Sequence, residues 1–193
     1  MSERSRIGLF GGTFDPVHDG HLQLAKRAVE ALALDQVRFL PCRISPHKTG
    51  TVPTPAAARL HMLRLATREL PWAVVDEYEI GVEGPSFSYR TAEEMVKRLP
   101  GARLFWIMGC DQWDALPQWA HPERLAACVE FIVFARDRIP APREGYRLHC
   151  VDGIHPASAT VIREAMARGD SPDWLDPAVA AWIAEHDIYQ KNI

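Results

Sequence analysis

The sequence lacks several features that would place it in other protein classes. Its four cysteines are scattered and form no Cys-x-x-Cys pair, so neither a zinc knuckle nor a disulfide framework is indicated. No apolar run reaches membrane-spanning length, and the first residues hold no signal-peptide core. The net charge of −3 argues against a surface that coats nucleic acid, because such binding needs a basic face. We therefore expect a cytoplasmic protein that binds neither nucleic acid nor membrane.

Two common nucleotide-binding motifs are also missing. Gly8, Gly11 and Gly12 are wrongly spaced for the dinucleotide fingerprint G-x-G-x-x-G, and no Gly-Lys-Ser/Thr completes a Walker P-loop. No internal repeat, low-complexity tract or linker interrupts the chain. A length of 193 residues suits one domain with a substantial core.

Short apolar runs alternate with segments of helical periodicity along the chain. Strands are expected at 7–10, 37–40, 73–76, 104–108, 131–135 and 147–151, and helices at 21–33, 55–69, 90–99, around 112–127, 158–168 and 177–186. This alternation predicts a single α/β domain over 1–193, a Rossmann-like, doubly wound parallel sheet. Ligands bind such sheets beyond the carboxyl ends of the strands. We expect the C-terminal helices, 158–193, to pack on the sheet and complete the active site.

A glycine turn with two histidines follows the first expected strand, in the segment GGTFDPVHDGH at 11–21. Gly11 and Gly12 have no β-carbon, so an anion can approach the backbone, and the following helix offers amide hydrogens and a positive dipole end. His18 and His21 are three residues apart, so they can share one face and donate to the same anion. A metal pair and two purely structural histidines are the alternatives. The pattern favours a phosphate or nucleotide site.

The turn resembles the signature of the nucleotidyltransferase superfamily, in which Gly-Thr-Phe-Asp-Pro leads into His-x-Gly-His. The resemblance implies that His18 and His21 are catalytic. It also implies that the turn binds the phosphates of ATP through four consecutive residues, Gly11, Gly12, Thr13 and Phe14.

Two further segments resemble cation-bearing motifs of the same superfamily. Pro46-His47-Lys48 is similar to the Pro-Pro-His-Lys of adenylyltransferases that act on nicotinate mononucleotide, with Ser45 in place of the first proline. Lys48 would then reach a phosphate, and an ordinary solvated lysine is the alternative. The segment 157–163 resembles Ile-Ser-Ser-Thr-x-Ile-Arg, with alanine at 157 and 159. Ser158 or Thr160 would cap a helix at an anion site, and Arg163 would fork two phosphate oxygens.

Three segments would hold the two nucleotides. Gly109 and Asp111 resemble a Leu-Gly-x-Asp turn that meets adenosine, although Asp111 would also suit a helix cap. Trp119 matches a tryptophan that stacks on the pyridine ring of nicotinate. The helix entrance expected to contact the nicotinate carboxylate comprises Ser88, Tyr89, Arg90 and Thr91, with Arg90 where the family carries threonine.

The resemblance implies the reaction of nicotinate-nucleotide adenylyltransferases, in which ATP and nicotinate mononucleotide give deamido-NAD and pyrophosphate. Mg²⁺ is expected on ATP and pyrophosphate oxygens, with few ligands from the protein and no separate metal site. The sequence leaves open whether the protein forms a homo-oligomer. Two alternatives remain: a pantetheine-phosphate adenylyltransferase, which shares the core, and a non-catalytic nucleotide-binding module.

Overall fold

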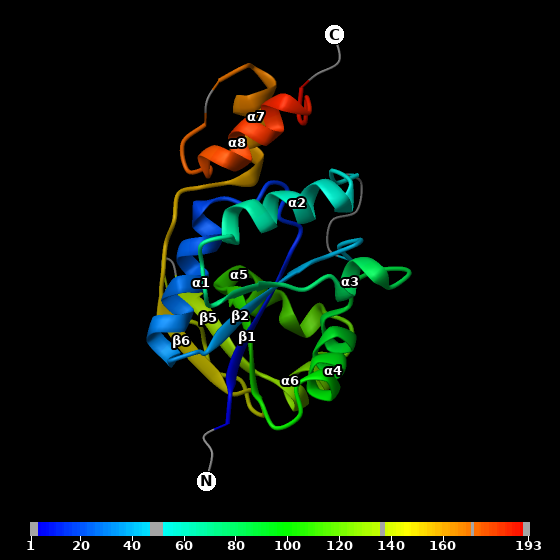
Figure 1. Cartoon of the computed structure of the whole chain (residues 1–193). Coiled ribbons are helices and arrows are strands. Elements are labelled where there is room, and N and C mark those ends of the chain that lie inside the picture. The colour runs from blue at the N-terminus through cyan, green and yellow to red at the C-terminus, as the bar shows by residue number, and fades with distance from the viewer. Residues whose placement is uncertain (1–3, 47–51, 136–137, 171, 191–193) are drawn as a thin grey trace.

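The computed structural model describes residues 4–46, 52–135, 138–170 and 172–190, and these form one α/β unit around a central sheet (Figure 1). All neighbouring strands run parallel, in the order β3-β2-β1-β4-β5-β6. The strands are β1 (Arg6–Gly12), β2 (Gln36–Pro41), β3 (Ala73–Val75), β4 (Arg103–Gly109), β5 (Glu130–Ala135) and β6 (Leu148–Asp152). The order reverses between β1 and β4, which is the switch point of a doubly wound sheet. The predicted fold class is confirmed.

Helices cover both faces of the sheet (Figure 1). Their bounds are α1 (Asp19–Leu32), α2 (Ala56–Thr67), α3 (Tyr78–Gly81), α4 (Ser88–Arg98), α5 (Cys110–Ala115), α6 (Pro122–Cys128), α7 (Ala159–Ala167) and α8 (Pro177–Glu185), with a 3-10 turn η1 (Leu116–Gln118) after α5. No helix in the described ranges is both long enough and apolar enough to cross a bilayer.

Each face of the sheet has its own hydrophobic core. Alternate strand residues such as Phe39 and Ile107 pack on α1 and α2, while Trp106 and Val133 point the other way, toward α4, α5 and α6. These side chains are buried because successive residues of a strand face opposite sides, and a parallel sheet is covered on both. This burial on both faces is the reason why the strands appear in the sequence as continuous apolar runs.

The structure differs from the predicted elements at four points. The short helix α3 was not predicted, and α4 begins at Ser88 rather than at residue 90. The segment 112–127 is not one helix but α5, η1 and α6, because Pro117 and Pro122 lack the amide hydrogen that helix continuation needs. Helix α1 begins at Asp19, two residues before the predicted start, so His18 is its N-cap.

The C-terminal helices lie at the end of the molecule opposite the N-terminus (Figure 1). Helix α8 packs against α2, where the rings of Trp182 and His61 lie 4.8 Å apart between centroids. Val179 and Ile183 of α8 extend the core formed on this side of the sheet. Helix α8 therefore joins the core on the side of the sheet that α2 covers.

Candidate active site at the carboxyl edge of the sheet

The two motif histidines lie side by side where β1 gives way to α1. Their rings are stacked with centroids 3.8 Å apart, so the two side chains lie on one face, as their spacing allows. The backbone amide of His18 donates to Nδ1 of His21 over 3.2 Å. Because Nδ1 accepts, the neutral His21 ring carries its proton on Nε2, the tautomer that can donate from that atom.

His18 is buried, with 8% of its surface exposed. Burial, helped by the nearby His155, lowers the pKa of the His18 imidazole to about 4. The ring is therefore neutral near pH 7, and it can act as a hydrogen-bond donor rather than as a cation. Its Nδ1 is buried without a hydrogen-bond partner among the described residues.

His155 is a third histidine that the sequence did not single out. It lies in the connection between β6 and α7, and its Nδ1 accepts the amide hydrogen of Ala157 over 3.1 Å. A β-carbon on Gly20 would come within 3.0 Å of the His18 ring and 3.1 Å of His155 Nδ1. The glycine between the motif histidines is thus needed for these rings to approach α1. The only sequence signal for His155 was its place just before the C-terminal motif.

The turn after β1 is held by side chains from distant parts of the chain. Arg59, 1% exposed, donates from Nη1 to the Thr13 carbonyl and from Nε to the Thr54 carbonyl, each over 2.8 Å. The Tyr189 hydroxyl donates to Asp15 Oδ1 over 2.5 Å, and the Thr54 amide donates to Oδ2 over 3.0 Å. These bonds fix the backbone that the glycines expose.

Arg163 of α7 reaches the same turn. Its Nη1 donates to the Asp15 carbonyl over 2.7 Å, and its Nη2 donates to Thr160 Oγ1 over 3.3 Å. Ser158 is the N-cap of α7, but its side chain makes no capping hydrogen bond, contrary to the expected cap, and Thr160 lies inside the helix. Helix α7 therefore brings Arg163 to the glycine turn.

Three other predicted phosphate or adenosine contacts have distinct surroundings. The Phe14 ring is 2% exposed and packs near the ring of His21, so only the Phe14 backbone is left for a ligand. Gly109 ends β4, and a β-carbon added there would meet no atom within 4 Å. Asp111 is exposed in the first turn of α5. The first amide of α1, that of Asp19, donates to the Trp174 carbonyl over 2.9 Å, so this amide is occupied and does not face a ligand as a free donor.

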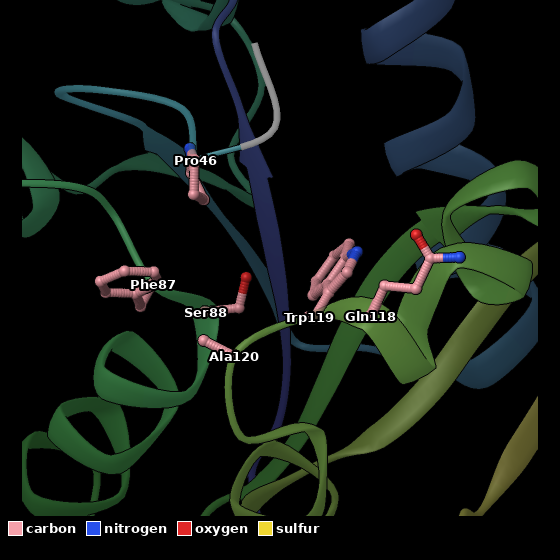
Figure 2. A pocket seen from close by; sticks show the side chains of 6 residues that line it. All are labelled: Pro46, Phe87, Ser88, Gln118, Trp119 and Ala120. Carbon is pink, nitrogen blue, oxygen red and sulfur yellow. The ribbon is translucent and has the colours of Figure 1, made fainter. Parts of the chain in front are cut away.

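A pocket of about 290 Å³ opens between the start of α4 and the end of η1. It is lined by Pro46, Phe87, Ser88, Gln118, Trp119 and Ala120. In Figure 2 the Ser88 hydroxyl points into the space between the rings of Phe87 and Trp119, with Pro46 above it. Aromatic walls with a hydroxyl and a helix start at the base suit a flat ring bearing an acid.

The other residues predicted at this helix entrance have separate roles. The Thr91 hydroxyl is buried and donates to Glu79 Oε1 over 2.7 Å, so it faces the protein rather than the pocket. The Arg90 side chain is exposed, donates from Nε to the Tyr89 hydroxyl over 3.0 Å, and lies over the Phe87 ring. Glu79 was not anticipated, because nothing near it in the sequence marks a buried acid.

Lys48, with His47, lies outside the described residues, so its predicted place stays a prediction. Within the described residues no group of three or more His, Cys, Asp or Glu side chains is arranged to hold a metal ion. Both carboxylate oxygens of Asp15 already accept hydrogen bonds, from Tyr189 and Thr54. The polar groups gathered at the turn are mainly donors, which suits an anion.

Comparison with known proteins agrees with this geometry. The family described as Cytidylyltransferase-like matches residues 9–165. A protein of Exiguobacterium sibiricum named "Probable nicotinate-nucleotide adenylyltransferase" is 41% identical over 95% of this chain and 98% of its own. The nicotinate-nucleotide adenylyltransferase of Bacillus subtilis is 33% identical over 96% of this chain and 99% of its own.

The fold is also shared with solved structures. The nicotinic acid mononucleotide adenylyltransferase of Plasmodium falciparum, complexed with APC, superposes with a TM-score of 0.79 at 14% identity, over 96% of this chain and 98% of that chain. The same enzyme complexed with NaAD gives 0.78. At this low sequence identity, the structural similarity shows a shared fold only. The match over most of the chain and the near full-length relatives place this protein in the Cytidylyltransferase-like family of nucleotidyltransferases, among its nicotinate-nucleotide adenylyltransferases.

Proposed function

We propose that this chain transfers the AMP moiety of ATP to nicotinate mononucleotide, giving deamido-NAD and pyrophosphate. One observation carries the proposal: a donor-rich glycine turn and an aromatic pocket with a helix start at its base lie along the same carboxyl edge of the sheet. The turn suits a polyphosphate, and the pocket suits a flat acidic ring. The relatives that carry the name of this activity span nearly the whole chain.

The chemistry needs positioning and charge neutralisation more than a base. The 5′-phosphate oxygen of nicotinate mononucleotide attacks the α-phosphorus of ATP in line. A new P–O bond forms while the bond from the α-phosphorus to the bridging oxygen breaks, and pyrophosphate leaves with the electron pair. A phosphate monoester is already nucleophilic near neutral pH, so no covalent intermediate with the protein is involved.

His18 and His21 are the groups we assign to the charge that develops on the phosphates. A neutral imidazole can donate a hydrogen bond to a phosphate oxygen through its single N–H, and a donor fixed beforehand costs no reorganisation during the reaction. Arg163 and Lys48 add positive charge. The backbone at Gly11–Thr13, Ser158, Thr160, Gly109 and Asp111 contacts the ATP side in this proposal.

Mg²⁺ enters this proposal with ATP, as part of the substrate. The described residues offer no carboxylate cluster that would hold the ion on its own. Bound to phosphate oxygens, the ion would neutralise charge on the leaving pyrophosphate. The residues of the chain then need only orient the complex.

The pocket beside α4 supports a preference for the acid form of the acceptor. Nicotinate and nicotinamide mononucleotides differ only by a carboxylate against a neutral amide. The first amides of α4, at Ser88 and Tyr89, and the Ser88 hydroxyl are donors of the right kind, and Trp119 would hold the pyridinium ring. A charge-assisted contact of ~2 to 4 kcal/mol corresponds to a kcat/KM preference of roughly 30-fold to 1000-fold.

The test is pyrophosphate release from ATP and Mg²⁺ with three acceptors: nicotinate mononucleotide, nicotinamide mononucleotide and phosphopantetheine. We expect turnover with the first at the stated preference over the second, and none with the third. Equal use of the two mononucleotides would refute the acid preference, and turnover only with phosphopantetheine would assign the alternative acceptor. ATP binding without turnover for any acceptor would make the chain a binding module.

Arg163 gives a matched pair of variants for the same assay. Arg163→Ala should raise the KM for ATP strongly, and Arg163→Lys should restore it poorly, because an ammonium cannot reproduce a planar fork of donors. Since Arg163 also bonds the Asp15 carbonyl, the melting temperature of both variants must be measured alongside. Full rescue by lysine would show that a point charge suffices.

A further inference from the structure

A second and larger pocket, of about 500 Å³, lies at the opposite edge of the sheet. It is formed where β1, β4 and β5 begin and is lined by Arg4, Arg6, Ala102, Arg103, Leu104, Ala127, Cys128, Val129, Glu130 and Arg147. In Figure 1 this edge is the end of the molecule where the N-terminus lies, away from α7 and α8. Six residue steps of β1 separate Arg6 from Gly12, about 20 Å at ~3.3 Å per residue. The pocket is therefore separate from the site proposed for AMP transfer.

The charge of this pocket is strongly positive in a chain whose net charge is negative. Among the lining residues, four arginines face a single carboxylate, that of Glu130. Asp35 lies nearby, where one of its carboxylate oxygens accepts the backbone amide of Arg6 over 2.8 Å, so it offsets part of the excess. The lining as a whole keeps a surplus of guanidinium groups.

Glu130 is already occupied by its own partners. Its side chain is 4% exposed, and its two oxygens accept from Arg103 Nε over 2.6 Å and Arg103 Nη2 over 2.7 Å. Arg147 Nη1 lies 3.2 Å from Oε1, and His149 Nε2 lies 2.7 Å from Oε2. These hydrogen bonds, that of Arg103 first, lower the pKa of the Glu130 carboxyl to about 2, so it stays ionised at neutral pH. The Glu130 carboxylate thus holds Arg103 and Arg147 in place, and its single negative charge does not neutralise the positive charges of Arg4 and Arg6.

Two of the arginines are held in fixed positions. The guanidinium groups of Arg6 and Arg103 lie over the buried ring of Phe105, 5.0 and 5.3 Å from its centroid. Arg6 also donates from Nε to the Leu32 carbonyl over 2.8 Å. Side chains that are already ordered lose little conformational entropy when they bind a ligand, which favours recognition of an anion.

We propose that this arginine pocket is a second ligand site, which binds a small multiply charged anion of the polyphosphate class. The donors of Arg4, Arg6 and Arg147 that point to solvent, with the remaining nitrogen of Arg103, would contact the phosphate oxygens. The volume exceeds that of a single phosphate, so a pyrophosphate or a nucleotide phosphate chain fits. The proposal does not depend on the reaction at the other edge of the sheet.

Inorganic pyrophosphate is the probe, titrated into the full-length protein while backbone amide shifts are followed by NMR. We expect a set of shifts at residues 4–6, 102–104, 127–130 and 147, separate from any set at the glycine turn. In the double variant Arg4→Gln/Arg147→Gln the affinity reported by the first set should fall about tenfold or more, and that reported by the second should not change. Both replaced side chains are exposed, so folding should be retained.

Two controls separate a site from general charge. The double variant Arg98→Gln/Arg168→Gln removes the same charge from exposed positions elsewhere and should leave the pocket affinity within about twofold. Sodium chloride at equal ionic strength should not reproduce the shifts. The proposal is overturned if pyrophosphate shifts only the glycine turn, if chloride gives the same shifts, or if both double variants weaken binding equally. Pyrophosphate release by the first double variant is expected to stay normal, so a failure here leaves the proposed reaction untouched.

Discussion

Replacing Glu79 by glutamine should change how the stability of the fold depends on pH. Glu79 belongs to α3, and its buried side chain accepts a hydrogen bond from Thr91 of α4. Burial raises the pKa of its carboxyl from an ordinary 4.5 to about 7, against the opposing effect of hydrogen bonds from Thr91 and Ser86. Glutamine keeps the size of the protonated acid and an oxygen that can accept from Thr91, but it cannot ionise.

The magnitude follows from the two pKa values. The folded state holds the Glu79 proton more tightly than the unfolded chain, so this stabilisation is complete below about pH 4.5 and is lost as the pH rises through 7. Between pH 5 and pH 8 the wild-type protein should lose about 2 to 3 kcal/mol of unfolding free energy relative to Glu79→Gln. Above pH 7 the variant should therefore be the more stable protein.

Urea unfolding of both proteins at a series of pH values measures this difference. When the unfolding free energies of the two proteins are subtracted at each pH, the contributions of all titrating groups that they share cancel. Glu83→Gln replaces an exposed glutamate four residues away and serves as the control, with a difference expected to stay flat across the range. A flat difference for Glu79→Gln as well would mean that the carboxyl is not shifted, and the argument from burial would fail.

Three further predictions concern the two edges of the sheet. His18→Ala should lower kcat for pyrophosphate release by roughly 10²-fold or more with little change in melting temperature, and near-normal turnover would make the ring structural. Trp119→Ala should raise the KM for nicotinate mononucleotide by roughly 5-fold to 30-fold, the loss of ~1 to 2 kcal/mol of ring contact, while the KM for ATP stays constant. Wild-type stability should fall by about 2 kcal/mol relative to Glu130→Gln as the pH drops from 5 to 3, because the lowered pKa of Glu130 gives a stabilisation that is present above pH 4.5 and is lost as the pH falls toward 2. Urea unfolding measures this last effect, and parallel acid curves for the two proteins would contradict it.

The sequence predicted the sheet well because burial on both faces leaves a local signal. Each apolar run marks a strand, and each return to helical spacing marks a helix, so the order of elements follows without any knowledge of contacts. The errors occur where local patterns are short or broken. Helix α3 covers only Tyr78–Gly81, too few residues to show a period, and the prolines near η1 divide a segment that looked continuous.

The candidate site was predictable only in part, for a different reason. The histidines of the glycine turn lie within a few residues of each other, so their place on one face could be inferred from spacing, whereas the stacking of their rings could not. Arg59 and His155 are far in the sequence from the turn and its helix, which they approach in the fold. The residues next to them in the sequence give no sign of these contacts. Glu79 carries the least signal of all, because a buried acid and an exposed one look the same in a sequence.

The bond between Tyr189 and Asp15 joins residues 174 positions apart. A growing chain therefore makes the glycine turn long before it makes this partner. Until Tyr189 and Arg163 have been synthesised, Asp15 has neither the hydroxyl that reaches its carboxylate nor the guanidinium that reaches its carbonyl. The sheet can form from what precedes them, but the turn acquires these two restraints only after Arg163 and Tyr189 have been made, so the site is completed long after its motif has been synthesised.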